Sequence, residues 1–317
     1  MYDKLKLSDE YGKIVGVSMD TFKLKVGLHP SYKITTKNFE DKTGNKYPYV
    51  QDQGMNKSRF AVCPACDNPI QIIGLYKNSL EGGKKAYGKH YSHDVRGIAN
   101  YSQEDYDDCP FANHNRHAST KYRSEKSRLS KEILLTVREQ IDRITYFLNY
   151  HTGLYISKKL ASSMLDNYLK SKGWRYRNTT LYNIPWIFAE CNDAFPLYGK
   201  CIRKDSELYQ SLSTTCPNLI FTPVNFGRKH EYVQITSSSY LTLNILFCHH
   251  SRKLEDEELV ESIDLWIYNQ KEDGELVTVF LKNFEINQND FVNLINNSSS
   301  RYRNQELLKM AEDRIIL

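Results

Sequence analysis

Apolar side chains recur at helical spacing in the middle of the chain. Between residues 126 and 149 one apolar stripe is formed by Leu129, Ile133, Val137, Ile141, Ile144 and Leu148. This spacing predicts an amphipathic helix over 126–149. A second apolar stripe predicts a helix over 157–172, because Ser157 is a suitable N-cap for its first turn. Two shorter helices are expected near the end of the chain, over 290–296 and 304–315.

The period changes to two in the last third of the chain. Apolar and polar side chains alternate over 240–247, 262–268 and 276–281, which predicts three strands. The turn sequence 272–274 lies between the last two strands, so these should form a hairpin. Before residue 120, partial alternation and turn residues predict short strands, among them 13–18, 22–28 and 69–76.

These patterns predict an α+β, or mixed α/β, protein with two domains. The first, residues 1–120, should be small and β-rich. The second, residues 121–317, should contain a mixed sheet covered by the two long helices. The boundary is placed near residue 120 because turn-rich sequence gives way there to the first long helix.

Composition narrows the class of protein. The chain has 317 residues, of which 40% are hydrophobic, and this is typical of a globular protein. No apolar run approaches the roughly 20 residues of a membrane helix. The first residues lack the apolar core of a signal peptide, so we expect a cytoplasmic location and no membrane partner. In a reducing compartment, 7 cysteines favour metal binding over a disulfide framework.

One metal-ligand pattern is explicit. Cys63 and Cys66 form a C-x2-C turn, and His90 and His93 form an H-x2-H pair downstream. Two thiolates on a tight turn, joined by ligands from a second segment, suit a tetrahedral Zn²⁺ ion. With Cys109 included, protein ligands fill all four positions, which predicts a closed, structural site.

The third and fourth zinc ligands stay open at this point. The candidates are His90, His93 and Cys109. The pair His90 and Cys109 is preferred over His90 and His93, because thiolates bind zinc tightly. A further candidate, His114, is interpreted as a surface histidine.

The Cys63-Pro-Ala-Cys66 and His90-Tyr-Ser-His93 motifs together resemble the N-terminal zinc-finger region of CoiA-like competence proteins. The resemblance covers residues 60–95. It implies a zinc finger in a bacterial DNA-related protein. In that family the finger precedes a nuclease-like domain, whose carboxylates we do not find downstream. This chain also differs in the longer gap between its two motifs and in the extra candidate ligand, Cys109.

A basic stretch follows the zinc motifs. Between residues 116 and 131 there are six cationic side chains and a single acidic one, Glu125. Such cations near a helix N-terminus would suit the phosphates of a nucleic-acid backbone. The alternative is a solvated basic face without a partner. The residues predicted to bind nucleic acid are Arg116, Lys121, Arg123, Lys126 and Arg128.

Two functions are compatible with these features. The first is a zinc-finger protein that binds nucleic acid, DNA included, or a partner protein, with composition suggesting a phage-defence or mobile-element system. The second is a metal-dependent nuclease, HNH-like or divergent. His93 with Asp94 could serve an HNH site, but in reversed order. A PD-(D/E)xK site at Asp264 and Lys282 would lack its second carboxylate, because Phe280 stands at that position. No complete catalytic set is found, which favours the binding protein.

Overall fold

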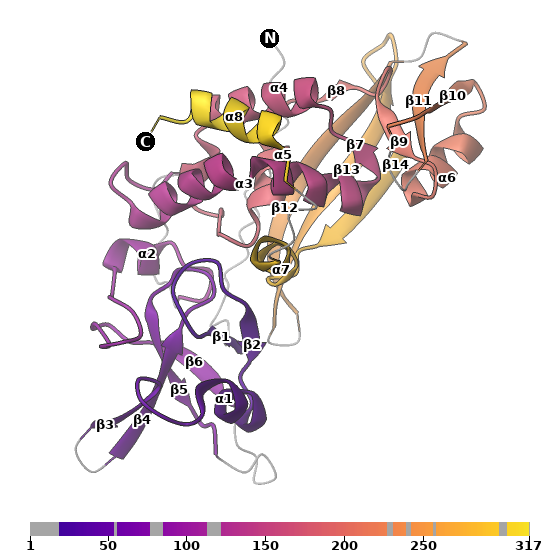
Figure 1. The fold of residues 1–317 in the computed structure, drawn as a ribbon. Helices are drawn as coiled ribbons and strands as arrows, with labels where there is room; N and C mark the ends of the chain where they lie inside the picture. Colours follow the sequence, from indigo (N-terminus) through magenta and orange to yellow (C-terminus); the bar gives the residue numbers. More distant parts are fainter. Residues whose placement is uncertain are drawn as a thin grey trace.

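The computed structural model describes residues 19–53, 56–76, 85–112, 122–226, 231–238, 242–255, 258–297 and 303–316. In these ranges the chain forms α-helices and three antiparallel sheets (Figure 1). The predicted α+β class is therefore confirmed. None of the described helices is long and apolar enough to span a membrane. The strand expected over 13–18 lies outside the described residues.

The N-terminal module, residues 19–112 with the gaps given above, is rich in strands, as expected. Its six-stranded sheet has the order β2-β1-β4-β5-β6, with β3 paired to β4. The strands are β1 (Thr21–Lys23), β2 (Ser31–Lys33), β3 (Val50–Gln53), β4 (Asn56–Val62), β5 (Pro69–Ile73) and β6 (Tyr87–His90). Two helices, α1 (Thr36–Thr43) and α2 (Gln103–Asp107), accompany them. The sequence patterns had not indicated these helices, and the strand expected over 22–28 ends at Lys23.

The two long helices form close to the predicted positions. Helix α3 spans Arg128–Thr152 and α4 spans Lys158–Lys170. The apolar stripe of α3 is buried throughout, and Ser127 caps its first turn by accepting a hydrogen bond from the Ser130 amide. The helix ends at Gly153, whose φ of 76° is the left-handed conformation that glycine adopts readily. The helices near the C-terminus are α7 (Asp290–Asn296) and α8 (Gln305–Arg314), as the sequence predicted.

The main sheet has the order β14-β13-β12-β8. Its strands are β8 (Phe195–Pro196), β12 (Leu243–Glu255), β13 (Glu258–Gln270) and β14 (Leu276–Glu285). Every pairing within it is antiparallel, so the expectation of a mixed sheet is wrong. The physical reason is that short connections join β12 to β13 and β13 to β14, and a parallel pair needs a longer crossover.

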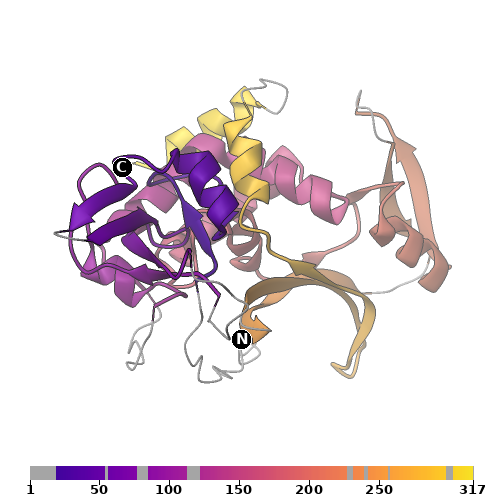
Figure 2. The ribbon, with the colours of Figure 1, turned by 90° about the horizontal axis from the view of Figure 1, so that it is seen from below.

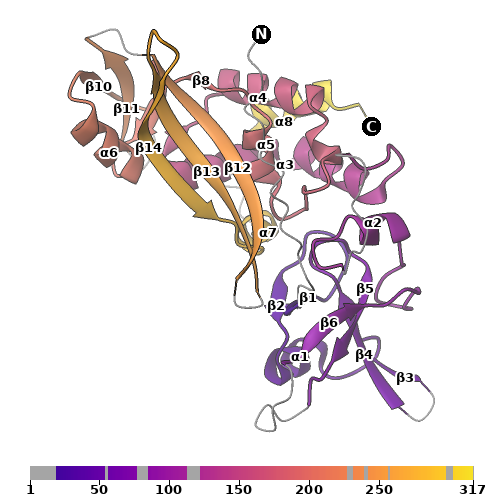
Figure 3. The same cartoon turned by 180° about the vertical axis from the view of Figure 1, so that it is seen from behind.

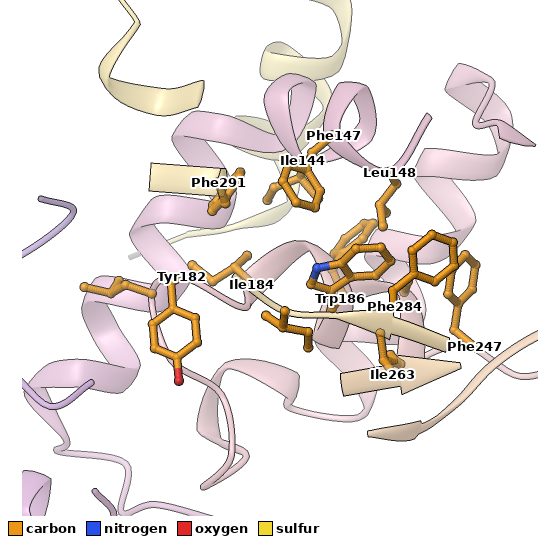
Figure 4. Packing of buried hydrophobic residues seen from close by; sticks show 14 of the residues in the cluster. Ile144, Phe147, Leu148, Tyr182, Ile184, Trp186, Phe247, Ile263, Phe284 and Phe291 are labelled. Atoms are coloured by element: carbon orange, nitrogen blue, oxygen red, sulfur yellow. The ribbon is translucent and has the colours of Figure 1, made fainter. Parts of the chain in front are cut away.

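A short buried helix, α5 (Ile184–Glu190), separates the main sheet from α3. Its residues Ile184–Ala189 are all buried. The Trp186 ring lies 5.6 Å from the Phe147 ring of α3 and 5.0 Å from the Phe284 ring of β14 (Figure 4). The long helices therefore cover the sheet mainly through α5. The 3-10 helix η2 (Gly173–Arg175) precedes α5.

A smaller sheet projects from the far end of the molecule, with the order β10-β11-β9-β7 (Figures 1 and 2). It consists of β7 (Leu154–Tyr155), β9 (Cys201–Arg203), β10 (Leu219–Val224) and β11 (Tyr232–Ser237). Helix α6 (Glu207–Thr215) packs beside β9 and β14. The sequence patterns did not reveal this sheet, because its strands are short and only partly alternating.

The N-terminal module packs against the body formed by residues 122–316. Ser31 and Asn289 exchange two hydrogen bonds, of 2.8 Å and 3.0 Å, and Asn296 donates to the Leu28 carbonyl at 3.0 Å. One apolar cluster runs from Met19 through both parts of the chain. The boundary expected at residue 120 falls among residues 113–121, outside the described ranges, and the two-domain division stays a prediction.

Candidate metal centre

The first two cysteines lie on a tight turn immediately after β4. The Asp67 amide donates to the Cys63 carbonyl at 3.2 Å, and the Cys63 amide donates to the Asn68 carbonyl at 2.9 Å. Asp67 has a φ of 60°, in the left-handed region that aspartate tolerates in turns. The amides of Ala65 and Cys66 donate to the Cys63 sulfur. The turn thus points both thiols and two amide dipoles at one position.

The remaining two ligands come from separate elements. His90 is the last residue of β6 and pairs with Ile70 of β5. Cys109 follows α2, and its amide donates to the Tyr106 carbonyl at 3.0 Å. The sulfur and nitrogen atoms of Cys63, Cys66, His90 and Cys109 all lie within 4.8 Å of one another.

The spacing of these atoms matches a tetrahedral ion. Bonds of about 2.3 Å to sulfur and about 2.0 Å to nitrogen place two sulfurs roughly 3.8 Å apart, and a sulfur and a nitrogen roughly 3.5 Å apart. The Sγ atoms of Cys63 and Cys109 are 3.6 Å apart. The Cys66 Sγ lies 3.3 Å from Nε2 of His90. The four donors could therefore bind one metal ion with little rearrangement.

The three sulfur ligands of the centre are buried, and His90 is half-buried. Cys63, Cys66 and Cys109 are at most 2% exposed. The His90 ring stands edge-on to the Tyr106 ring at 5.0 Å. With four protein ligands and buried sulfurs, the centre offers no position for a substrate, which is the pattern of a structural site.

Asn68 fixes the turn to α2. Its side-chain amide donates to the Cys66 Sγ at 3.4 Å and to the Ser102 carbonyl at 3.0 Å. In return the Ser102 amide donates to Oδ1 of Asn68 at 2.6 Å. Such partners orient metal ligands and steady their charge. Sequence analysis missed Asn68, although its position two residues after the second cysteine was a usable signal.

Asp108, the residue before Cys109, anchors this segment to the body. Its side chain is 1% exposed, and Oδ2 lies 3.1 Å from Nε of Arg123. The same carboxylate pairs with Arg177. Arg123 also donates to the carbonyls of Arg177 and Thr179, both at 2.7 Å. One buried ion cluster therefore links the fourth ligand to the turn before α5.

Without a cation, the three thiols could not ionise together. Burial raises the pKa of Cys66, and burial together with neighbouring Cys63 raises the pKa of Cys109 well above its usual value. Burial also acts to raise the pKa of Cys63. Hydrogen bonds from Cys109, Cys66 and two backbone amides outweigh it, and the pKa of Cys63 lies well below its usual value. Donors thus gather on one sulfur, whose negative charge a divalent cation would balance.

His93 stands apart from the centre. His93, the alternative ligand, is exposed and lies outside the four-ligand group, with its ring edge-on to Tyr91 at 5.5 Å. Its position three residues beyond the end of the ligand strand turns it away from the sulfurs. His114 lies outside the described residues.

The structure revises the basic stretch. Arg116 and Lys121 lie outside the described residues. Arg123 is 1% exposed, and its guanidinium is held in the Asp108 cluster, so its predicted contact with phosphate is corrected to a structural role. Arg128 is partly exposed but pairs with Asp105 at 2.9 Å, while Lys126 is exposed.

The residues considered for a PD-(D/E)xK site lie on opposite faces of the main sheet. Asp264 bonds His249 and Asn283, at 3.0 Å and 2.7 Å. Lys282 alternates with Asn283 along β14 and pairs instead with Glu207 of α6. These two side chains do not converge on a common metal position.

Comparison of the chain with protein-family models, curated proteins and solved structures found no match.

Proposed function

We propose that this chain is a nucleic-acid-binding protein whose N-terminal module is held in shape by one structural Zn²⁺ ion. The proposal is carried by the buried group of three thiols and one imidazole at tetrahedral spacing. Three soft sulfur donors with one nitrogen favour zinc over magnesium or calcium, which prefer oxygen ligands. Zinc is also stable without redox change in a reducing compartment.

Zinc would cross-link three segments of the N-terminal module. It would join the turn after β4, the end of β6 and the segment after α2. One face of the six-stranded sheet carries a small apolar cluster of five buried residues, namely Phe60, Val62, Val95, Ile98 and Ala99. The opposite face of the sheet belongs to the large apolar cluster shared with the body. Metal binding would add to this packing, because the binding free energy is also folding free energy.

The surface of the N-terminal module carries an excess of positive charge. In the described part of the module, residues 19–112, five acidic side chains are exposed, Glu40, Asp41, Asp52, Asp94 and Asp107. Nine cationic ones are exposed, Lys25, Lys33, Lys37, Lys42, Lys46, Lys57, Lys85, Lys89 and Arg96. Such an excess attracts a phosphate backbone and supports nucleic acid as the partner.

The salt dependence of binding tests this proposal. The full chain should bind a 30-nucleotide probe, and log K should fall linearly with log salt concentration. Replacing Lys57, Lys89 and Arg96 together by Gln should flatten the slope by roughly 2 to 3, because each phosphate contact contributes about 0.7 on a single strand and about 0.9 on a duplex. Gel-shift or anisotropy titrations measure this slope.

A matched control separates local contacts from overall charge. Lys159 and Lys170 of α4 and Lys172, just after it, are exposed on the body. Replacing these three by Gln removes the same charge, and the slope should change by less than about 1. Equal slopes for the two triple variants would contradict a nucleic-acid surface on the N-terminal module. No binding by wild-type protein at about 50 mM salt would instead make a protein partner the leading account. The phage-defence context stays a prediction.

A further inference from the structure

The main sheet has one covered face and one open face. Ile263, Leu265 and Ile267 of β13 are fully buried and belong to the apolar cluster that includes α5. Ser262, Asp264 and Trp266, which alternate with them along the strand, are half-buried and lie on the opposite face. None of the described helices lies over this second face (Figure 3).

A histidine–aspartate pair stands on the open face. Nδ1 of His249 lies 3.0 Å from Oδ2 of Asp264, and Asn283 donates to Oδ1 of the same carboxylate at 2.7 Å. His249 sits where the pairing of β12 with β13 is interrupted, and its φ is 55°. Non-glycine residues at positive φ are strained and cluster at functional sites.

This pairing prepares His249 to accept a proton. A carboxylate can only accept, so the neutral imidazole must carry its proton on Nδ1 and leave Nε2 as a free acceptor. The His249 side chain is 64% exposed, whereas Asp264 is 16% exposed. A carboxylate that orients an accessible imidazole in this way is the arrangement of a general base.

A hollow of about 370 Å³ adjoins the pair on the same face. It is lined by Ser251, Lys253, Val260, Ser262, Asn283 and Glu285. Ser262 and Asp264 are two residues apart on β13, which places them about 7 Å apart along the strand. The hollow therefore offers a cation, an amide, two hydroxyls and the Glu285 carboxylate to a ligand within reach of His249, and its size suits one nucleotide.

The surroundings restrict the chemistry of this site. Among the described residues, the cysteine centre is the one group of three or more side chains placed to bind a metal ion. The open face of the main sheet therefore has no such group for a two-metal site. The hydroxyls of Ser251 and Ser262 lie 3.2 Å apart and bond to each other. The Sγ of Cys248 lies 3.6 Å from Nδ1 of His249, but burial and the neighbouring charge of Asp264 raise the pKa of this thiol to about 12, so it stays protonated and is a poor nucleophile. The nucleophile that His249 can activate is then water or a hydroxyl of the substrate. RNA carries one, because its 2′-hydroxyl lies beside each phosphodiester.

We propose that the open face of the main sheet cleaves single-stranded RNA by transesterification without a catalytic metal ion. Nε2 of His249 takes the proton of the 2′-hydroxyl, O2′ forms a bond to phosphorus, and the bond from phosphorus to O5′ breaks. The proton returns from His249 through a water molecule to O5′. Lys253 offsets the charge on the non-bridging oxygens, the Asn283 amide donates a hydrogen bond to one of them, and Asp264 is a positioning residue. The products are a 2′,3′-cyclic phosphate and a 5′-hydroxyl.

This activity goes beyond the proposed function and is separable from it. Zinc at the cysteine centre and cations on the N-terminal module act on stability and binding. The histidine pair acts on bond cleavage. A chain that binds nucleic acid but does not cut RNA would refute this inference alone.

The test uses the full wild-type chain and an end-labelled RNA of mixed sequence, in buffer without added divalent cations. The expected result is cleavage to fragments ending in 2′,3′-cyclic phosphate. An all-DNA strand should stay intact, and a DNA strand with one ribonucleotide should be cut only there. RNA that stays intact with the wild-type protein, or cleavage of the all-DNA strand, would overturn the proposal.

Variants separate catalysis from folding. His249→Gly suits the φ of 55° and should lower the rate at least about 100-fold. Added imidazole should restore part of this rate, which a structural role would not allow. Asp264→Asn should lower kcat more than it raises KM. His93→Ala, a change of an exposed histidine outside both sites, should leave the rate unchanged. Wild-type cleavage by His249→Gly would refute the assignment.

Discussion

At the residue scale, the buried carboxylate of Glu261 in the body contacts four polar side chains. Glu261 is 3% exposed and accepts hydrogen bonds from Tyr182 at 2.7 Å and Asn183 at 2.6 Å. Nε2 of His250 lies 2.6 Å from it, and Nε of Arg252 lies 3.3 Å away. Burial acts to raise the pKa of Glu261, but the charge of Arg252 and the bonds from His250 and Asn183 lower it to about 2.

This pKa shift predicts how stability depends on pH. The folded-state pKa of about 2 lies below the ordinary value of 4.5, so Glu261 stabilises the fold above pH 4.5. That contribution is lost as the pH falls from 4.5 toward 2. Glu261→Gln should lower the free energy of unfolding at pH 7 by about 3–5 kcal/mol, because Arg252 stays buried without its counter-charge.

Urea denaturation at a series of pH values measures both effects. The Glu261→Gln variant should also lose less stability than wild type between pH 4.5 and 2. Glu306→Gln is the matched control, because Glu306 pairs with Lys158 at an exposed position and the change should stay within about 0.5 kcal/mol. Parallel pH profiles for wild type and Glu261→Gln would contradict the account.

At the element scale, the local sequence pattern predicted the two long helices but did not predict α5. The stripe of α3 and the cap at Ser157 for α4 depend on residues three or four apart, which a sequence displays directly. Helix α5 is buried on every side and shows no periodicity, and Pro185 suggested a break. Proline is tolerated in the first turn of a helix, where its missing amide is not needed, and Pro185 is the second residue of α5. Strand direction likewise depends on distant pairing, and the mixed sheet was expected wrongly.

The position of α5 predicts that Trp186 is a central packing residue. Trp186→Ala should lower the free energy of unfolding by about 3–5 kcal/mol, because the cavity would adjoin Phe147 and Phe284. Tyr150→Ala is the control, since Tyr150 is 57% exposed on α3. It should cost less than about 1 kcal/mol. Chemical denaturation measures the difference, and similar losses for both variants would show that α5 does not bridge α3 and the sheet.

At the scale of the whole molecule, the metal centre depends on contacts that sequence spacing cannot show. The turn at Cys63 and Cys66 was predicted because its ligands are close in sequence. Cys109 reaches the centre because Asn68 bonds Ser102 and because Asp108 is anchored by Arg123. Such long-range contacts are set by tertiary packing, and the sequence therefore left His93 open as an alternative. The same contacts removed Arg123 from the expected nucleic-acid surface.

The central claim is that one Zn²⁺ ion is held by Cys63, Cys66, His90 and Cys109. X-ray absorption at the zinc edge of the purified full chain tests it most directly. The account predicts about one zinc per chain, with three sulfur ligands near 2.3 Å and one nitrogen ligand near about 2.0 Å. Cys109→Ser should lose one sulfur ligand or the ion itself, whereas Cys201→Ser, a half-buried cysteine of β9, should keep the wild-type spectrum. A shell of two sulfurs and two nitrogens, or protein without tightly bound zinc, would contradict the claim.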